Sequence, residues 1–132
     1  MEDGPTTHMV GSPFWMPPEM IRKQPHSFPA DIWSFAICMM ELCEQNPPNH
    51  TDSLKAMFLI GIGQAPQLQE PEKWSEEMKD FFNLCLEIDP VKRATAEQLL
   101  THNLCKKADS QRAMEQILQQ IFLQESLAMQ GF

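Results

Sequence analysis

The sequence predicts an all-α fold. Apolar residues recur at helical spacing in several segments, and no segment alternates apolar and polar residues as half-buried strands do. Residues that cap helices stand directly before several of these segments, and proline or glycine follows them. With 132 residues, the chain is long enough to bury one modest core.

The first expected helices follow a loop. Residues 1–17 contain glycine, proline and threonine without a hydrophobic period, which is typical of a loop. A short helical turn is expected over residues 18–21, because the proline at its start suits the first turn of a helix. Residues 30–43 are apolar on nearly every side, which predicts a helix that other elements surround.

Four further helices are expected after the break at residues 46–49. Thr51, Asp52 or Ser53 can cap a helix that Gly61-Ile62-Gly63 ends. Ser75 can cap the next helix, and Thr95-Ala96-Glu97-Gln98 fits the capping box of a short one. The last helix should begin near Ser110 and carry one apolar stripe, made of Met114, Ile117, Leu118, Ile121 and Phe122.

Composition limits the kinds of partner and compartment. The net charge is −8 and the sequence pI about 4.9, so nucleic acid and anionic membrane surfaces should be repelled. The four cysteines lie within apolar helical patterns, so we expect buried, reduced thiols. No basic and apolar leader begins the chain, and no apolar run is long enough for a membrane span. We expect a cytoplasmic protein with protein partners and without nucleic acid or membrane.

Two motifs near the start carry a family resemblance. The first is Gly11-Ser12-Pro13-Phe14-Trp15-Met16-Pro17-Pro18-Glu19, and the second is Asp31-Ile32-Trp33-Ser34. They resemble the end of the activation segment and the central helix of serine/threonine protein kinases. The similarity extends over residues 9–107. It looks most like the PAK branch of the sterile-twenty-like kinases, on the strength of residues 9–16, 56–60, 71–73 and 85–93.

The resemblance implies three parts. Residues 1–17 would be a truncated activation-segment loop. Residues 18–107 would form a partial large lobe, its helical lower half, with helices resembling the F to I helices of kinases. Residues 108–132 would add an amphipathic C-terminal helix.

The resemblance also assigns roles to single residues. In kinases the glutamate matching Glu19 pairs with the arginine matching Arg93, and a guanidinium can donate two parallel hydrogen bonds to a carboxylate. The alternative is two surface charges that never meet. The aspartate matching Asp31 binds the catalytic loop. Without that loop we expect Asp31 to be exposed, to have a raised pKa, or to cap its own helix.

The loop Ser12, Pro13, Phe14 and Trp15 matches the segment that receives a substrate residue in kinases. Two positions depart from the family pattern. Pro17 replaces an alanine, and His8 stands where the family has its activating phosphothreonine. Thr6 and Thr7 are adjacent and could be phosphorylated, but in kinases the arginine that receives the phosphate belongs to the catalytic loop, which has no counterpart here. We therefore expect no regulation through this switch.

The sequence lacks the residues that hold ATP and magnesium in the complete family. It contains neither a His-Arg-Asp triplet nor a Val-Ala-Ile-Lys motif. Asp80-Phe81-Phe82 should be a core stripe rather than a magnesium site, and Gly61-Ile62-Gly63 should end a helix rather than bind phosphate. We therefore expect no catalytic, cofactor-binding or metal-binding residue in this chain.

These observations favour a truncated, non-catalytic kinase-like module that binds proteins, for example as a decoy. The expected contacts, besides the loop, are Lys55, Met57 and Phe58 on the helix that resembles helix G. For Met57 and Phe58, core packing is the alternative. Two other interpretations stay open: a piece of an active ATP-dependent serine/threonine kinase, and a relic without function.

The last expected helix could cover an exposed apolar surface. In a complete kinase, segments that have no counterpart here partly cover the central helix, so we expect Trp33, Ile37, Met40 and their neighbours to form an exposed apolar face. We hypothesise that residues 110–129 fold back over that face or pair with another copy of themselves. A frayed terminal helix is the alternative.

Overall fold

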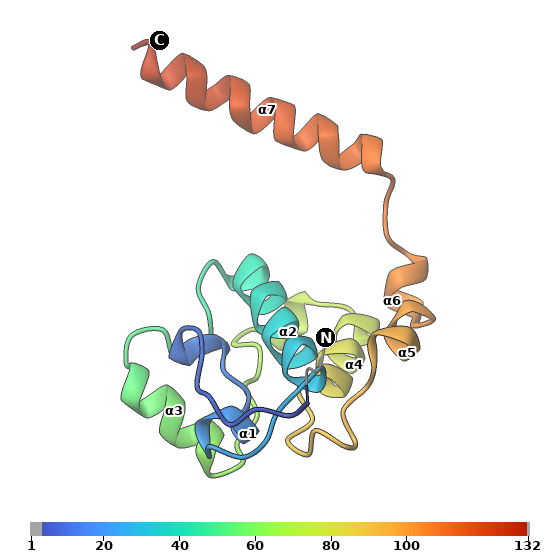
Figure 1. Cartoon of the computed structure of the whole chain (residues 1–132). Coiled ribbons are helices and arrows are strands. Elements are labelled where there is room, and N and C mark those ends of the chain that lie inside the picture. The colour runs from blue at the N-terminus through green and yellow to red at the C-terminus, as the bar shows by residue number, and fades with distance from the viewer. Residues whose placement is uncertain (1–3, 132) are drawn as a thin grey trace.

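The computed structural model describes residues 4–131, which fold into helices joined by loops (Figure 1). In chain order the elements are the 3-10 helix η1 (Pro13–Trp15), α1 (Pro18–Ile21), α2 (Pro29–Glu44), α3 (Ser53–Gly61), the 3-10 helix η2 (Pro71–Lys73), α4 (Glu76–Cys85), α5 (Ala96–Leu100), α6 (Asn103–Lys106) and α7 (Gln111–Met129). The described residues contain no strand, only a single bridge between Thr6 and His26. The all-α prediction is confirmed.

Side-chain caps fix the N-termini of α3, α4, α5 and α7, and a fifth side-chain cap lies at α6. Asp52 caps α3, Ser75 caps α4 and Ser110 caps α7, each by accepting a backbone N–H from the first turn. Thr95 and Gln98 form the complete capping box of α5. Each cap satisfies a backbone donor that the helix itself cannot pair, which explains why these short segments are helical. Asp52, Ser75 and the Thr95–Gln98 box were predicted as caps, and Ser110 was predicted as the start of the last helix.

The core forms around α2, which lies between α3 and α4 in Figure 1. Trp33, Ile37 and Met40 are almost completely buried, so the expectation that these three side chains would form an exposed face is wrong. They pack with buried residues of the other elements, namely Ile60, Phe81, Phe82, Cys85, Leu86, Ala94 and Leu99. Burying one such large apolar side chain stabilises the fold by about 1.5–3 kcal/mol, so this cluster holds α2 to α5 together.

One face of α2 lies outside this core. Phe35, Cys38 and Leu42 are exposed and follow one another at helical spacing. The prediction that other elements surround this helix is therefore wrong. The pattern misled because the outer face of α2 carries apolar residues as well as the inner one.

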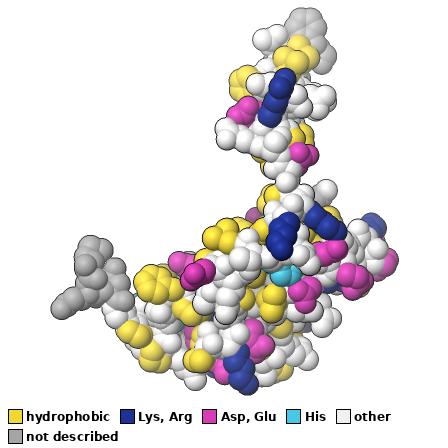
Figure 2. All heavy atoms as spheres, turned by 90° about the vertical axis from the view of Figure 1, so that its right-hand side faces the viewer, with side chains coloured by type: hydrophobic (Ala, Val, Ile, Leu, Met, Phe, Trp, Pro, Cys, Tyr) yellow, Lys and Arg dark blue, Asp and Glu magenta, His cyan; other side chains and the backbone are white. Residues whose placement is uncertain are grey.

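The hypothesis that the last helix folds back onto α2 is also wrong. Residues 107–110 connect α6 to α7, and α7 stands away from the body of the molecule (Figure 1). None of its side chains is buried. The side view in Figure 2 shows the same protruding arm above the body.

The cysteines are free thiols, and one of them is buried. Burial raises the pKa of Cys85 to about 12 and raises the pKa of the half-buried Cys43 above its ordinary value. Cys38 and Cys105 are exposed, so the expectation of four buried thiols is wrong for these two. Cys38 lies on the exposed face of α2, and the Cys105 thiol donates to the carbonyl of Leu99 at 3.2 Å although the residue is exposed.

The short elements η1, η2 and α6 were not predicted, because three or four residues are too few to show a helical period. His102 caps α6, since its Nδ1 accepts the Leu104 N–H at 3.0 Å. Within residues 4–131, no helix has the length and apolar character to cross a membrane.

Candidate functional site

A buried ion pair joins two distant parts of the chain. Nη1 of Arg93 donates to Oε1 of Glu19 at 2.7 Å, and Nη2 donates to Oε2 at 2.9 Å. The Arg93 side chain is 0% exposed and the Glu19 side chain 2%. This is the two-pronged geometry that suits a guanidinium and a carboxylate. The structure thus brings together the two residues that the family resemblance paired.

The guanidinium of Arg93 has further acceptors. Nη1 also donates to the carbonyl of Pro29 at 2.8 Å, Nε to the carbonyl of Glu87 at 2.9 Å, and Nη2 to that of Ile88 at 3.4 Å. The guanidinium carbon lies 5.3 Å from the centroid of a Trp33 ring, within cation–π range. An arginine has five N–H donors, and these bonds employ all three of its nitrogens. Arg93 therefore ties α1, the start of α2 and the loop after α4 to one another.

The loop that the resemblance assigns to substrate contact is held beside α2. The Trp15 N–H donates to the carbonyl of Ser12 at 3.2 Å, which closes η1. Oγ of Ser34 donates to the carbonyl of Trp15 at 2.7 Å, and the rings of Phe14 and Trp15 meet edge to face with centroids 5.9 Å apart. Ser12 is exposed, whereas Pro13, Phe14 and Trp15 are half-buried. The loop thus presents Ser12 to solvent on a partly packed aromatic base.

α3 lies next to η1 and presents an exposed apolar ridge. Leu54 is 78% exposed, Phe58 64% and Ile62 57%. These residues are four positions apart and share one face, and we call them the α3 ridge. Lys55 beside the ridge is exposed, and Met57 is half-buried.

The structure shows which of the expected contact residues on α3 are exposed and which are partly packed. Core packing, the alternative considered for Phe58, is wrong because this ring faces solvent. Leu54 and Ile62 were not among the expected contacts. Their spacing of four residues on either side of Phe58 indicates that the three share one face, but it does not indicate that this face is exposed.

Basic side chains border the α3 ridge, although the whole chain carries a charge of −8. Nε of Arg22 donates to the carbonyl of Gly61 at 2.9 Å, at the C-terminal end of α3. A cation is favourable there because the helix dipole is negative at that end. Lys23 follows Arg22, and Lys55 lies at the other end of the ridge; both are exposed. The local charge is therefore opposite in sign to that of the protein as a whole.

A surface hollow of about 490 Å³ lies between the C-terminal end of α2 and the segment after α3. Carboxamide side chains form much of its wall, namely Asn46, Asn49, Gln64, Gln67 and Gln69. Carboxamides both donate and accept hydrogen bonds, as a peptide backbone does. The hollow is thus a polar neighbour of α3.

The segment before η1 is tied to the loop before α2. Thr6 and His26 exchange two backbone hydrogen bonds of 3.0 and 2.7 Å. Nε2 of His26 donates to the carbonyl of His8 at 2.7 Å, so His8 contributes through its backbone. Asp31 is exposed in the first turn of α2, and the cap position belongs to Phe28 without a side-chain bond. The interpretation of Asp31 as a helix cap is therefore wrong.

The segments that resemble nucleotide-binding motifs have other roles. Oδ2 of Asp80 accepts from Nε2 of His102 at 2.7 Å, and the two phenylalanines after Asp80 are buried in the core. Gly63 has φ 92° and its N–H donates to the carbonyl of Ile60, which ends α3. Among the residues that the structure describes, no three His, Cys, Asp or Glu side chains cluster to hold a metal ion. The Asp80 segment therefore packs in the core and bonds to α6, and the Gly61–Gly63 segment ends α3.

These features together are those of the lower half of a protein-kinase large lobe. They are the buried Glu19–Arg93 pair, the loop held against α2, and the helices packed around α2. The chain belongs to the protein kinase domain family, since the family model described as "Protein kinase domain" matches residues 1–105. The match covers the whole body of the molecule and ends before α7.

Relatives of this chain are named as serine/threonine kinases. It is 54% identical over 125 residues to the probable serine/threonine-protein kinase mkcB of Dictyostelium discoideum, a match that covers 95% of this chain and 18% of mkcB. It is 51% identical over 116 residues to mkcC of the same organism, covering 88% of this chain and 13% of mkcC. Serine/threonine-protein kinase shk2 of Schizosaccharomyces pombe is 41% identical over 101 residues, or 76% of this chain and 17% of shk2. The chain thus spans less than a fifth of each relative.

The similarity to mkcB includes α7. A match of 125 residues is longer than the 110 residues that precede α7, so it must extend well into that helix. α7 therefore lies outside the family model but within a region shared with mkcB.

Proposed function

We propose that this chain is a protein-binding module of PAK-type kinase ancestry and that its 132 residues by themselves transfer no phosphate. One observation carries the proposal: η1 and the α3 ridge are neighbours, and both present side chains to solvent. The missing His-Arg-Asp and Val-Ala-Ile-Lys motifs support the second part. Such a module acts as a decoy that occupies kinase substrates or regulators.

The chemistry of the surface defines the ligand. An exposed ridge of Leu54, Phe58 and Ile62 favours an apolar side chain of the partner, because burying it releases water from both surfaces. Lys55, which follows Leu54 in the chain, and Arg22, which is hydrogen-bonded to the Gly61 carbonyl at the end of α3, favour a carboxylate next to that side chain. The ligand class is therefore an apolar and acidic peptide segment of a protein, and the location that fits free thiols is the cytoplasm.

A second candidate function has its own observation. The relatives are several times longer than this chain, and their names describe serine/threonine kinases. Within such a longer protein, the same surface would hold a protein substrate while other segments bind ATP and magnesium. Both candidates use η1 and α3 for protein contact and differ in whether phosphate transfer accompanies binding.

Peptide binding to the purified chain tests the proposal. Fluorescence anisotropy is measured with labelled peptides. Each peptide contains a serine or threonine, then a large apolar residue, and then an acidic residue. Phe58→Ala should weaken binding by about 5- to 30-fold, the effect of losing about 1–2 kcal/mol at a central contact. Lys55→Glu should weaken the binding of acidic peptides, most strongly at low salt.

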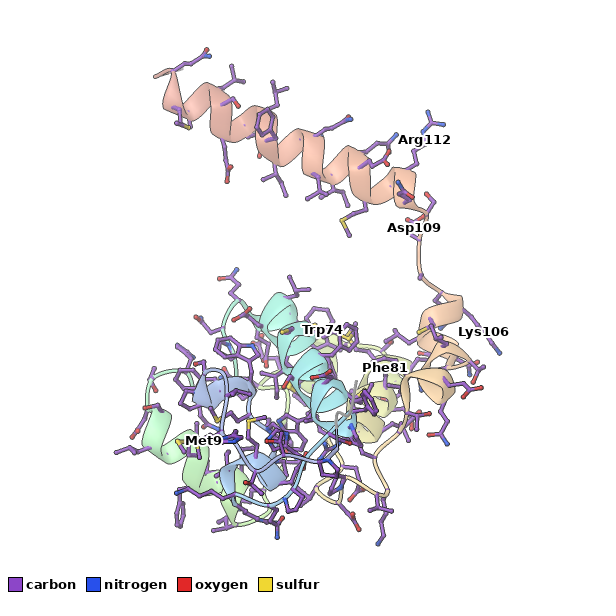
Figure 3. All side chains as sticks on the ribbon, in the orientation of Figure 1. Met9, Trp74, Phe81, Lys106, Asp109 and Arg112 are labelled. Carbon is purple, nitrogen blue, oxygen red and sulfur yellow. The ribbon has the colours of Figure 1, made fainter. Side chains whose placement is uncertain are left out.

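Two matched variants serve as controls. Leu100→Ala removes a 74% exposed side chain from α5, and Lys106→Glu reverses a charge on α6, at the opposite side of the body from Met9 and α3 (Figure 3). Neither should change binding. Equal affinities in all four variants, or no peptide binding at all, would contradict the protein-binding proposal. Incorporation of phosphate from ATP by the chain alone would contradict its non-catalytic part.

A further inference from the structure

α7 is a long helix without a partner in the part of the chain that the structure describes. Its stripe, made of Met114, Ile117, Leu118, Ile121 and Phe122, follows one face, and each of these side chains is exposed. Helices of this length draw most of their stability from the packing of such a face. The arm protrudes from the body in Figures 1 and 2, so the face is accessible to another molecule.

The area of the α7 stripe is sufficient for a specific contact. Its five side chains are between 47% and 72% exposed. Large apolar side chains exposed to this degree each present roughly 100 Å², so two stripes together would bury about 1,000 Å². That is the lower limit for a specific interface, and it predicts a dimer that forms in a concentration-dependent manner.

Charge selects a second copy of α7 as the occupant. α7 carries Arg112, Glu115 and Glu125, a net charge of −1, while the whole chain carries −8. The exposed face of α2 is flanked by the acids Asp31 and Glu41, so docking α7 there would bring its glutamates toward like charges. Pairing through protruding, nearly neutral arms keeps two acidic bodies apart.

The polar residues of the stripe face select the orientation. Gln111 and Glu125 lie at the two ends of this face, seven residues on either side of Leu118. In an antiparallel pair with Leu118 on the two-fold axis, the Gln111 amide of each copy lies opposite the Glu125 carboxylate of the other. In a parallel pair, the two Glu125 carboxylates would face each other and repel. Arg112 stays outside the contact and points away from the body (Figure 3).

We propose that two copies of this chain dimerise through an antiparallel pair of α7 helices, with the α7 stripe as the buried seam. The region takes no part in the kinase family match, yet it lies within the similarity to mkcB. The proposed partner is therefore a second copy of this chain, and the protein-binding surface at α3 remains free in both copies.

Analytical ultracentrifugation of the full chain tests the pairing. The parent protein should shift with increasing concentration from the monomer mass of 15.2 kDa toward about 30 kDa. Leu118→Glu places two like charges at the two-fold axis and should leave a monomer at every concentration. Leu123→Glu is the matched control, because Leu123 is 60% exposed, close to the 56% of Leu118, but lies on the opposite face of α7. It should dimerise like the parent.

Several results would overturn the proposal. These are a parent chain that stays monomeric at all concentrations, a Leu118→Glu variant that still dimerises, or equal loss of pairing in Leu118→Glu and Leu123→Glu. Dissociation by Leu42→Glu on α2 would also overturn it, since that result places α7 on the α2 face.

A charge variant tests the orientation. Gln111→Lys should strengthen the antiparallel dimer at low salt, because the new cation lies opposite Glu125 of the other copy. Gln116→Lys on the opposite face of α7 is its control and should have no such effect. Weaker pairing of Gln111→Lys would indicate parallel helices and overturn the proposed arrangement.

Discussion

Replacing Arg93 with alanine removes the partner of a carboxylate that has almost no contact with water. Glu19 is 2% exposed and accepts two hydrogen bonds from Arg93, of 2.7 and 2.9 Å. Leaving one member of such a buried pair unmatched costs about 3–5 kcal/mol. The carbonyls of Pro29, Glu87 and Ile88 lose a donor at the same time. Since a domain of this size is stabilised by only about 5–15 kcal/mol in total, the variant should be marginally folded or unfolded.

Urea unfolding measures this loss. It is followed by far-ultraviolet circular dichroism and by tryptophan fluorescence, to which the buried Trp33 and the half-buried Trp15 and Trp74 contribute. With a slope of about 2 kcal/mol per molar urea, the midpoint of Arg93→Ala should fall by roughly 2 M. Lys73→Ala is the control, because Lys73 pairs with Glu70 on the surface, and such pairs contribute about 0–1 kcal/mol. Equal midpoints for Arg93→Ala and Lys73→Ala would refute the reasoning.

A double variant separates the ion pair from general packing. Glu19→Leu combined with Arg93→Met replaces both charges by apolar groups of similar length, so no buried charge is left unmatched. Its loss of stability should be smaller than the sum of the two single losses. Additive losses would show that the two side chains stabilise the fold independently.

Two further predictions concern ionisable groups. Cys38 and Cys105 should react quickly with a thiol reagent near pH 8. Burial raises the pKa of Cys85 to about 12, so Cys85 should react only after unfolding. Mass spectrometry of the labelled peptides measures the rates, and equally fast labelling of Cys85 would contradict the prediction. The hydrogen bond from Lys107 lowers the pKa of Glu77, so the small stabilisation from this pair is present at neutral pH and disappears as the pH falls through the folded-state pKa. Lys107→Ala should raise the Glu77 pKa in a carboxyl NMR titration, and an unchanged value would contradict the assigned cause.

The helices could be predicted from the sequence because their signals are local. Ser75, Thr95 and Ser110 stand where a helix needs acceptors for its free N–H groups, and the structure has caps at all three. The position of α7 could not be predicted in this way. An apolar stripe indicates that a helix needs a partner, but it does not identify the partner or the direction of the chain after residue 107.

Less of the candidate site could be predicted from local sequence patterns. Glu19 and Arg93 are 74 positions apart, so family resemblance, and no local pattern, pointed to their contact. Phe58 was nominated as a contact on the same ground. Leu54 and Ile62 were missed because, on a short helix with Ala56 and Ile60 on its inner face, apolar spacing does not distinguish the buried side from the exposed one.

Chemical-shift mapping tests the proposed function most directly. The chain is labelled with ¹⁵N and titrated with the peptide that binds best in the anisotropy assay. Binding as proposed predicts perturbed amide signals in η1 at residues 12–15 and along α3 and its end at residues 54–62, with signals of α5 and α6 unchanged. Perturbations confined to α5 and α6, or none at saturating peptide, would contradict the assignment of protein binding to this surface.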